Sequence, residues 1–161
     1  LTLMHLIGPR WAVFGRKDAQ QLAIVSAMVR DLAVPVEIVP VDIRREPDGL
    51  AMSSRNSYLS PEQRGRALAL SRALEAGRAA AAAGADAAAV RRAAAELLAA
   101  EPGVEVDYVA VVDPLTLVER AGAGLGLPGA GGVAADGVVL LAVAARVGRT
   151  RLIDNALIDL G

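Results

Sequence analysis

The sequence predicts an α/β chain in two parts: the end of a larger doubly wound parallel sheet, then two helices packed on a small antiparallel sheet. Strand, helix and strand patterns follow one another within roughly the first 40 residues, which is the order of a βαβ unit with a right-handed crossover. Two Ala-rich helical patterns come next, and the apolar period then changes to the alternation typical of strands. A length of 161 residues, with 54% hydrophobic residues, suits one domain or one small domain joined to part of another.

Composition excludes several classes of protein. A net charge of −1 excludes a strongly basic nucleic-acid binder, and the hydrophobic content excludes disorder of the whole chain. Without cysteine there is no disulfide scaffold, thiol nucleophile or thiolate metal site, and the single His leaves little for zinc. No apolar run approaches the roughly 18 residues of a membrane span, and the first residues lack the pattern of a signal peptide. We therefore expect a cytoplasmic protein that binds neither nucleic acid nor membrane and supplies no metal site of its own.

The first part of the chain is predicted to contain a strand over 11–14, a helix over 19–33 and a strand over 36–39. Apolar residues of the helix recur at spacings of three and four, which predicts one buried face. These residues are Leu22, Val25, Met28, Val29 and Leu32. Two parallel strands cannot bury both faces of a sheet and leave an unpaired edge, so we expect self-association or strand exchange between copies, and a homodimer.

The second part is predicted to begin with a polar loop over 44–59. The Ser60–Gln63 segment then has the pattern of a capping box with proline at the first helical position, so a long helix is expected over 61–83. A second helix is expected over 86–100. The side chains predicted to be buried are Ala67, Leu70, Leu74 and Ala81 on the first helix, and Val90, Ala94, Leu97 and Leu98 on the second.

Three strands complete the prediction, over 104–112, 138–146 and 152–160, with a hairpin turn at 147–150. In the first strand, one face is expected to carry Val104, Val106, Tyr108, Ala110 and Val112. The Gly-rich stretch from Gly122 to Gly137 resembles a nucleotide-binding loop by composition. It is predicted to be a flexible connection between strands instead, because no helix follows it to face an anion.

A candidate ligand site follows the first strand, at residues 14–21. The strand ends, Gly15 allows a close turn, and a helix begins with Lys17 at its start. In an open parallel sheet, ligands bind at this end of the strands, and Lys17 would contact a nucleotide phosphate. The structural alternative is that Asp18 and Gln21 form a capping box that only closes the helix start.

A second candidate site is the loop Met52-Ser53-Ser54-Arg55-Asn56. Two hydroxyls, a guanidinium and an amide form a mobile surface rich in hydrogen-bond donors, which suits a polyphosphate whose charge shifts during nucleotidyl transfer. A surface turn without function would have the same composition. The loop lies one strand further along the chain than Lys17, so we expect both to serve one crevice.

Three segments resemble one known family, the pantothenate synthetases or pantoate–β-alanine ligases. They are FGRKDAQQ at 14–21, REPDGLAMSSRNSYLSPEQR at 45–64 and ARVGRTRLIDNALIDLG at 145–161. The resemblance runs through the whole chain in order, and DGLAMSSRN is highly specific. It covers only the C-terminal portion of the family, because the N-terminal portion, with its HIGH-type motif and several pantoate contacts, has no counterpart here.

The resemblance implies a fold and a reaction. Residues 1–43 would be the tail of a Rossmann-like nucleotidyltransferase domain, and residues 44–161 a small α+β lid domain. In this family ATP, accompanied by Mg2+, reacts with pantoate to give pantoyl adenylate and pyrophosphate, and the amine of β-alanine then attacks the adenylate. The remaining N-terminal portion of the enzyme is an expected partner.

The resemblance also implies roles for particular residues. Gly15, Lys17 and Asp18 would line the ATP site, with Lys17 on the phosphates, and Gln21 would hold pantoate. Met52, Ser53, Ser54 and Arg55 would correspond to the KMSKS loop of related synthetases, clamping the triphosphate and stabilising the adenylation transition state. Lys17, Ser53, Ser54 and Arg55 would therefore be the catalytic residues, and Arg44 joins the nucleotide-binding set.

Two residues depart from the family pattern. Arg16 stands where the family usually has Glu, and Arg44 where it has a small or apolar residue; both add positive charge beside the expected ATP site. Two other functions stay open, a non-catalytic fragment or assembly module of the same family and an ATP-binding domain with another acceptor.

Overall fold

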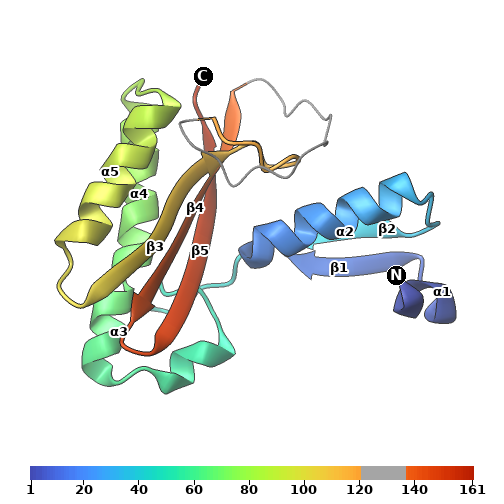
Figure 1. Ribbon diagram of the computed structural model, residues 1–161, viewed down its shortest axis with the longest axis horizontal. Coiled ribbons are helices and arrows are strands. Elements are labelled where there is room, and N and C mark those ends of the chain that lie inside the picture. The colour runs from blue at the N-terminus through green and yellow to red at the C-terminus, as the bar shows by residue number, and fades with distance from the viewer. Residues whose placement is uncertain (121–136) are drawn as a thin grey trace. The chain divides into compact units, whose positions relative to one another are not determined.

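The computed structural model describes residues 1–120 and 137–161. Within them the chain forms two compact units, Leu1–Ile43 and Arg44–Gly161 (Figure 1). The first contains a two-stranded parallel sheet and the second a three-stranded antiparallel sheet, so the predicted α/β class is confirmed. The roles of the two units, as the tail of a nucleotide-binding domain and as a lid, stay predictions. Of the predicted Gly-rich connection, only Gly137 lies within the described residues.

The first unit is a βαβ arrangement, as predicted. Its elements are helix α1 (Thr2–Ile7), strand β1 (Trp11–Gly15), the 3-10 helix η1 (Arg16–Asp18), helix α2 (Ala19–Asp31) and strand β2 (Glu37–Val41). The strands are parallel, with Trp11 opposite Glu37 and Gly15 opposite Val41. Helix α1 was not among the expected elements, because its 6 residues are too few to display a helical period.

The prediction that α2 buries one face is wrong. Leu22, Val25, Met28 and Val29 are only partly covered, and Leu32, just beyond the helix, is 57% exposed. Two strands present too narrow a surface to cover a helix of 13 residues. The apolar period therefore indicated correctly that a helix forms, but the described chain lacks the surface that would bury it.

The second unit begins with the 3-10 helix η2 (Ser54–Tyr58), followed by the helices α3 (Pro61–Ala67), α4 (Ala69–Ala82) and α5 (Ala87–Ala100). The capping box forms as predicted, because the Gln63 N–H donates to Ser60 Oγ at 3.2 Å and the Ser60 N–H donates to Gln63 Oε1 at 3.0 Å. The single long helix was wrong, since it is interrupted at Leu68. The Ser71 hydroxyl donates to the Leu68 carbonyl at 3.0 Å, and such bonds to the preceding turn often bend helices.

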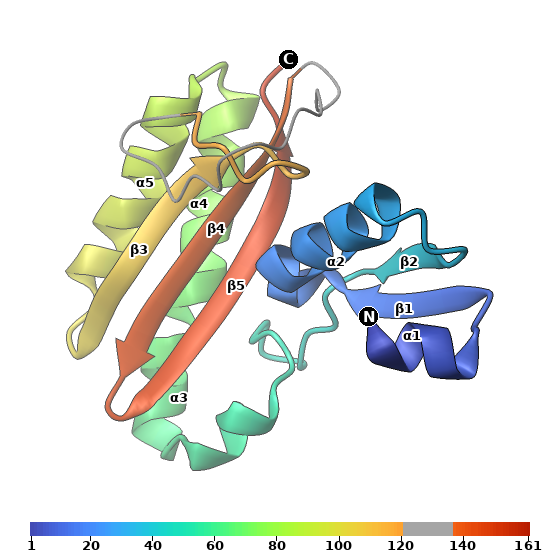
Figure 2. The same cartoon turned by 45° about the vertical axis from the view of Figure 1, so that its right-hand side comes forward.

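The sheet contains three antiparallel strands in the order β3 (Val104–Val112), β4 (Val138–Val147) and β5 (Thr150–Asp159). Helices α4 and α5 cover one face of it (Figures 1 and 2). The hairpin between β4 and β5 turns at Gly148, where φ is 60°, a value that favours glycine. The predicted strands and their antiparallel order are confirmed, with β5 beginning two residues earlier than expected.

The expected alternation in β3 is wrong beyond Val106, because the strand contains a bulge. The register shifts between Val106 and Tyr108, which pair with Ala145 and Ala144. The extra residue exchanges the two faces of the strand, so that Val111, opposite Leu141, faces the core. A bulge leaves no mark in the apolar pattern, which continues without a break through this strand.

The core of the second unit lies between the sheet and its helices. Its largest fully buried side chains are Leu70, Leu74, Val90, Leu98, Val111, Leu141, Val143 and Val147. The predicted helix stripes are buried except for Leu97, which is partly buried. Helix α4 approaches β4 so closely at Gly77 that an added Cβ there would clash with Leu141 Cδ2. In the part of the chain that the structure describes, no helix has the length and apolar character of a membrane span.

Candidate functional site

The turn between β1 and α2 carries the first group of predicted site residues. Strand β1 ends at Gly15, one 3-10 turn holds Arg16, Lys17 and Asp18, and α2 begins directly afterwards. Gly15 has an ordinary extended backbone, with φ −73° and ψ 133°, and nothing lies within 4 Å of the position that a Cβ would occupy. Neither backbone strain nor packing of the described chain therefore requires glycine there.

The unexpected charge of Arg16 is balanced locally. Arg16 Nε lies 3.1 Å from Asp42 Oδ1, just beyond the end of β2, and the Arg16 side chain is 38% exposed. Asp42 thus partly offsets the charge that Arg16 adds, and the place of Arg16 beside the ATP site stays a prediction. Lys17 lies in the same turn and is half-buried.

The capping-box alternative for Asp18 and Gln21 is not realised. Asp18 is the N-cap residue of α2, but its side chain makes no capping hydrogen bond. Both side chains are exposed. The start of α2 thus brings Gly15, Lys17, Asp18 and Gln21 to one end of β1, and the alternative explanation for two of them is removed.

The second group lies in a loop that is more ordered than expected. Residues 44–52 fold as a small hairpin, in which Arg45 bridges Ala51, the Glu46 N–H donates to the Leu50 carbonyl at 2.8 Å and the Met52 N–H donates to the Arg44 carbonyl at 2.8 Å. Leu50 and Ala51 are buried in the second unit. The hairpin therefore fixes the position at which Met52 and the residues after it begin.

The segment Met52–Arg55 continues from this hairpin into η2. Ser53 caps η2, with its Oγ accepting from the Arg55 N–H at 3.3 Å. Met52, Ser54 and Arg55 are exposed, and Ser53 is half-buried. Within residues 1–120 and 137–161, no carboxylate pairs with Arg44 or Arg55. Two hydroxyls and two unneutralised guanidinium groups are thus gathered on one loop, a donor set that suits a polyphosphate.

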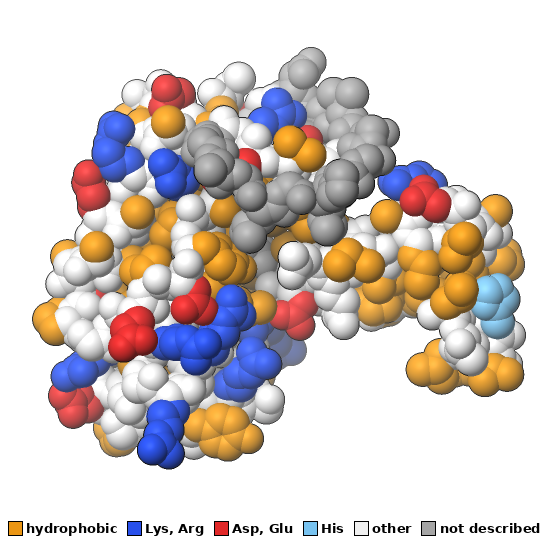
Figure 3. Space-filling view, viewed as in Figure 1, with side chains coloured by type: hydrophobic (Ala, Val, Ile, Leu, Met, Phe, Trp, Pro, Cys, Tyr) orange, Lys and Arg blue, Asp and Glu red, His pale blue; other side chains and the backbone are white. Residues whose placement is uncertain are grey.

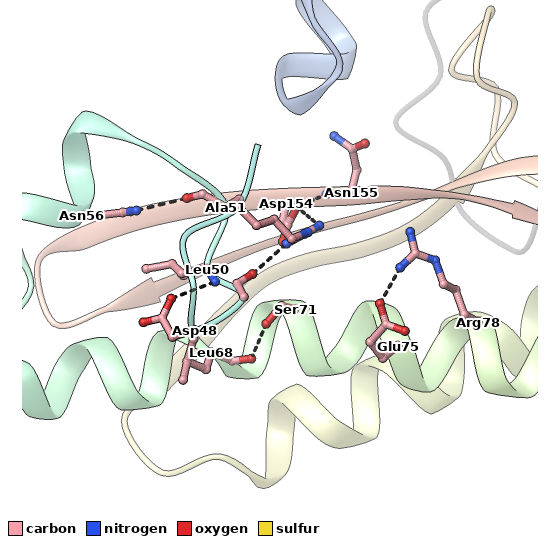
Figure 4. A network of polar contacts seen from close by, with 12 residues as sticks. Asp48, Leu50, Ala51, Asn56, Leu68, Ser71, Glu75, Arg78, Asp154 and Asn155 are labelled. Carbon is pink, nitrogen blue, oxygen red and sulfur yellow. Dashed lines mark hydrogen bonds and ion pairs between the residues drawn. The ribbon is translucent and has the colours of Figure 1, made fainter. Parts of the chain in front are cut away.

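The amide of Asn56 does not belong to this donor surface, contrary to the sequence-based expectation. Asn56 is buried, and its Nδ2 donates to the Ala51 carbonyl at 3.1 Å (Figure 4). The same Nδ2 donates to Glu46 Oε1 at 2.6 Å. Glu46 in turn accepts from Arg64 on α3 at 2.6 Å. Asn56 therefore turns inward and fastens the loop rather than offering donors to a ligand.

Sequence reasoning missed the residues that hold the loop in place. The Arg45 guanidinium donates to both oxygens of Asp154 on β5, at 2.6 and 3.1 Å, and to the Gly49 carbonyl at 3.1 Å. Asp154 is 3% exposed. The one sequence signal was an Arg and an Asp within two recognisable motifs, and their separation of 109 positions shows no local pattern.

The carboxylates beside the loop stay ionised. Hydrogen bonds from Asn56 and then Arg64 lower the pKa of Glu46 below its ordinary value. Desolvation raises the pKa of Asp48, but the Leu50 N–H and Arg64 outweigh it, and that pKa is also lowered. Glu46 and Asp48 together raise the pKa of Arg64. These groups form a charged structural network and are not poised to exchange protons near neutral pH.

The sequence profile of the pantoate-beta-alanine ligase family matches residues 1–157. The chain belongs to this family. It is 53% identical over 155 residues to the pantothenate synthetase of Thermobifida fusca, an alignment that covers 95% of this chain and 49% of the relative. The crystal structure of pantothenate synthetase from Thermus thermophilus superposes with a TM-score of 0.81 at 46% identity, covering 96% of this chain and 52% of that one.

A more distant pantoate–β-alanine ligase, from Francisella tularensis, was crystallised with Beta-gamma ATP and β-alanine. It shares the fold, with a TM-score of 0.59 at 21% identity, covering 96% of this chain and 46% of that one. The chain thus spans about half the length of the pantoate–β-alanine ligases that it matches. The resemblance stated from the motifs at 14–21, 45–64 and 145–161 is therefore confirmed, including its restriction to a portion of the family's length.

Proposed function

We propose that this chain supplies the nucleotide-clamping portion of a pantoate–β-alanine ligase, which joins pantoate to β-alanine through a pantoyl adenylate. The observation that carries the proposal is the family match over residues 1–157 together with the donor set of the loop at 52–55. The reaction needs such donors, because a carboxylate must approach an anionic phosphate before pyrophosphate can leave. Cations and hydrogen-bond donors directed at the developing charge lower that barrier.

Two groups of residues would bind ATP. In the first unit, Gly15 would let the nucleotide approach the backbone, Lys17 would contact the phosphates, Asp18 would line the site and Gln21 would hold pantoate. In the second unit, Met52, Ser53, Ser54 and Arg55 would clamp the triphosphate, with Arg44 beside them. The open space at Gly15 and the unpaired guanidinium groups of Arg44 and Arg55 in the described chain support these assignments.

Magnesium would enter with the nucleotide. Among the described residues, no group of three or more His, Asp or Glu side chains could hold a metal ion. Mg2+ commonly binds through substrate phosphates, with few protein ligands and several waters. The chain's own contribution would be to position the phosphates that carry the ion.

The remaining portion of the enzyme is the proposed partner of the first unit. Hydrophobic side chains gather over this unit (Figure 3), including Leu3, Leu6, Ile7, Trp11 and Val13, which are all more than half exposed. In the described chain β1 and β2 pair only with each other, so each strand has an unpaired edge. Further strands and their helices would cover both the edges and the apolar side chains. A homodimer and a cytoplasmic location are further parts of this proposal.

The test is pantoate-dependent release of pyrophosphate from ATP and Mg2+, by the chain alone and mixed with a separately made N-terminal portion. We expect activity only in the mixture, with β-alanine then yielding pantothenate. Lys17→Ala in the mixture should abolish release of pyrophosphate while the circular dichroism of the chain is unchanged. Full activity of Lys17→Ala would refute its assigned role. Absence of ATP binding and of activity in every mixture would favour a non-catalytic assembly module.

A further inference from the structure

The segment Met52–Arg55 is fixed at both ends, and we call it the arch. At its start, the Met52 N–H donates to the Arg44 carbonyl at 2.8 Å. At its end, Asn56 Nδ2 donates to the Ala51 carbonyl at 3.1 Å, which ties the residue after the arch to the residue before it. The Asn56 side chain therefore holds the two ends of the arch together. Three of the four side chains of the arch stay exposed.

The base of the arch is joined to the sheet by Arg45. Both oxygens of the buried Asp154, which is labelled in Figure 4, accept from this guanidinium. The same group donates to the Gly49 carbonyl in the turn of the hairpin. Paired, planar contacts of this kind fix direction as well as distance. Arg45 thus sets where the hairpin, and with it the arch, stands on β5.

The end of the arch is joined to α3 by a chain of polar contacts. Asn56 donates to Glu46 Oε1 at 2.6 Å, and Arg64 donates to Glu46 Oε2 at 2.6 Å and to Asp48 Oδ2 at 2.8 Å. The donor and acceptor directions are fixed, because Asn56 faces two acceptors and can satisfy them only with its amide nitrogen. The capping box of Ser60 fixes the start of α3, so Arg64 makes these contacts from an ordered helix.

We propose that Asn56 and Arg45 are positioning residues, which hold the arch in the shape that receives the nucleotide's phosphates. The inference rests on the proposed function, because it assigns the arch to the phosphates. Neither residue would touch the nucleotide. Their effect is to order the arch before binding, so that association does not have to order the Ser53, Ser54 and Arg55 backbone.

Asn56→Asp tests this idea with almost no change in size. An ionised carboxylate at position 56 would face the Glu46 carboxylate and the Ala51 carbonyl, and two acceptors would be left without a donor. We expect amide hydrogen exchange at Met52, Arg55 and Asn56 to accelerate by about tenfold or more, the effect of leaving such buried groups unpaired. Affinity for MgATP, measured by calorimetry on the 161-residue chain, should fall by a similar factor.

A compensating change separates positioning from a general structural role. Glu46→Gln combined with Asn56→Asp restores one donor–acceptor pair, because the carboxamide introduced at position 46 can donate to the carboxylate and still accept from Arg64. The double variant should recover slow exchange at Met52 and most of the MgATP affinity. Glu75→Gln is the matched control, since Glu75 pairs with Arg78 on the exposed face of α4, away from the arch. It should change neither measurement.

The two measurements together decide between the outcomes. Fast exchange and weak binding in Asn56→Asp, with recovery in the double variant, would support the proposal. Unchanged exchange in the arch, or fast exchange with unchanged affinity, would overturn it. If Asn56→Asp does not fold, Arg45→Lys replaces it: a retained charge without the paired contacts should weaken binding, and full affinity would overturn the proposal. If MgATP binds neither to the unaltered chain nor to its mixture with the N-terminal portion, the proposed function fails, and hydrogen exchange still shows whether Asn56 orders the arch.

Discussion

At the scale of single residues, two helical glycines have opposite surroundings, and their substitution should change stability in opposite directions. Gly77 on α4 faces Leu141 and, at 3.4 Å from an added Cβ, Val90. Gly77→Ala should destabilise the chain by about 1–3 kcal/mol, the usual effect of overpacking a core. Gly65 on α3 has no neighbour within 4 Å, and Gly65→Ala should stabilise by about 1 kcal/mol through helix propensity. Urea unfolding measures both, and equal effects would contradict the close contact of α4 with β4.

Gly15 provides the functional counterpart. Its φ of −73° is available to every residue and its surroundings are open, so Gly15→Ala should leave stability within about 0.5 kcal/mol of the parent. A methyl group there would stand where the nucleotide is proposed to approach the backbone. We expect MgATP affinity to fall by about tenfold, which corresponds to a steric cost of about 1.4 kcal/mol. Gly65→Ala serves as the control, and tight binding by Gly15→Ala would remove Gly15 from the site.

At the scale of elements, the network of Glu46, Asp48 and Arg64 predicts how acid affects the second unit. The folded-state pKa of each carboxyl is lowered, so their stabilising contribution is complete above the unfolded carboxyl pKa, about 4, and is lost as pH falls through the lower folded values. Urea unfolding between pH 6 and pH 2 should show this loss. In Arg64→Met the acid dependence should be shallower, whereas Arg78→Met, which breaks the exposed pair with Glu75, should keep the parent's slope. Parallel profiles for all three proteins would contradict the network.

Local signals in the sequence were sufficient for most elements and for the direction in which the strands pair, but not for the polar contacts between distant residues. The capping box at Ser60 and the stop at Gly84 depend on neighbouring residues, so the start of α3 and the end of α4 were predicted closely. The bulge after Val106 and the break at Leu68 depend on register and on one hydroxyl, which leave no periodic mark. The prediction that α2 is buried on one face was wrong for another reason. The apolar spacing of α2 requires a surface to pack against, and the two described strands are too few to supply it.

The same distinction holds for the candidate site. The motif at 52–56 identified the exposed donors, because residue types alone define a polyphosphate-binding surface. It placed Asn56 among those donors, since nothing local shows that its amide turns inward to Ala51 and Glu46. The sequence did not predict that Asp154 pairs with Arg45, since only the folded sheet brings them together. Sequence therefore indicates what a site could bind, and the fold shows what holds it in shape.

At the scale of the whole molecule, the unpaired strands of the first unit predict that the chain alone self-associates. Trp11, the single tryptophan, lies on β1 with 55% of its surface exposed and its Nε1 donating to Glu37 at 3.0 Å. Pairing of strand edges between copies would bury its ring. Sedimentation velocity should therefore show larger species as concentration rises, and Trp11 emission should shift to the blue in parallel.

Val13→Lys should suppress both changes, because a charge on an exposed edge strand opposes pairing. Adding the N-terminal portion should dissociate the self-associated species, since the N-terminal portion and a second copy of the chain would compete for the same strand edges. A parent chain that stays monomeric at every concentration, with constant emission, would show that α1 and α2 protect those edges without a partner.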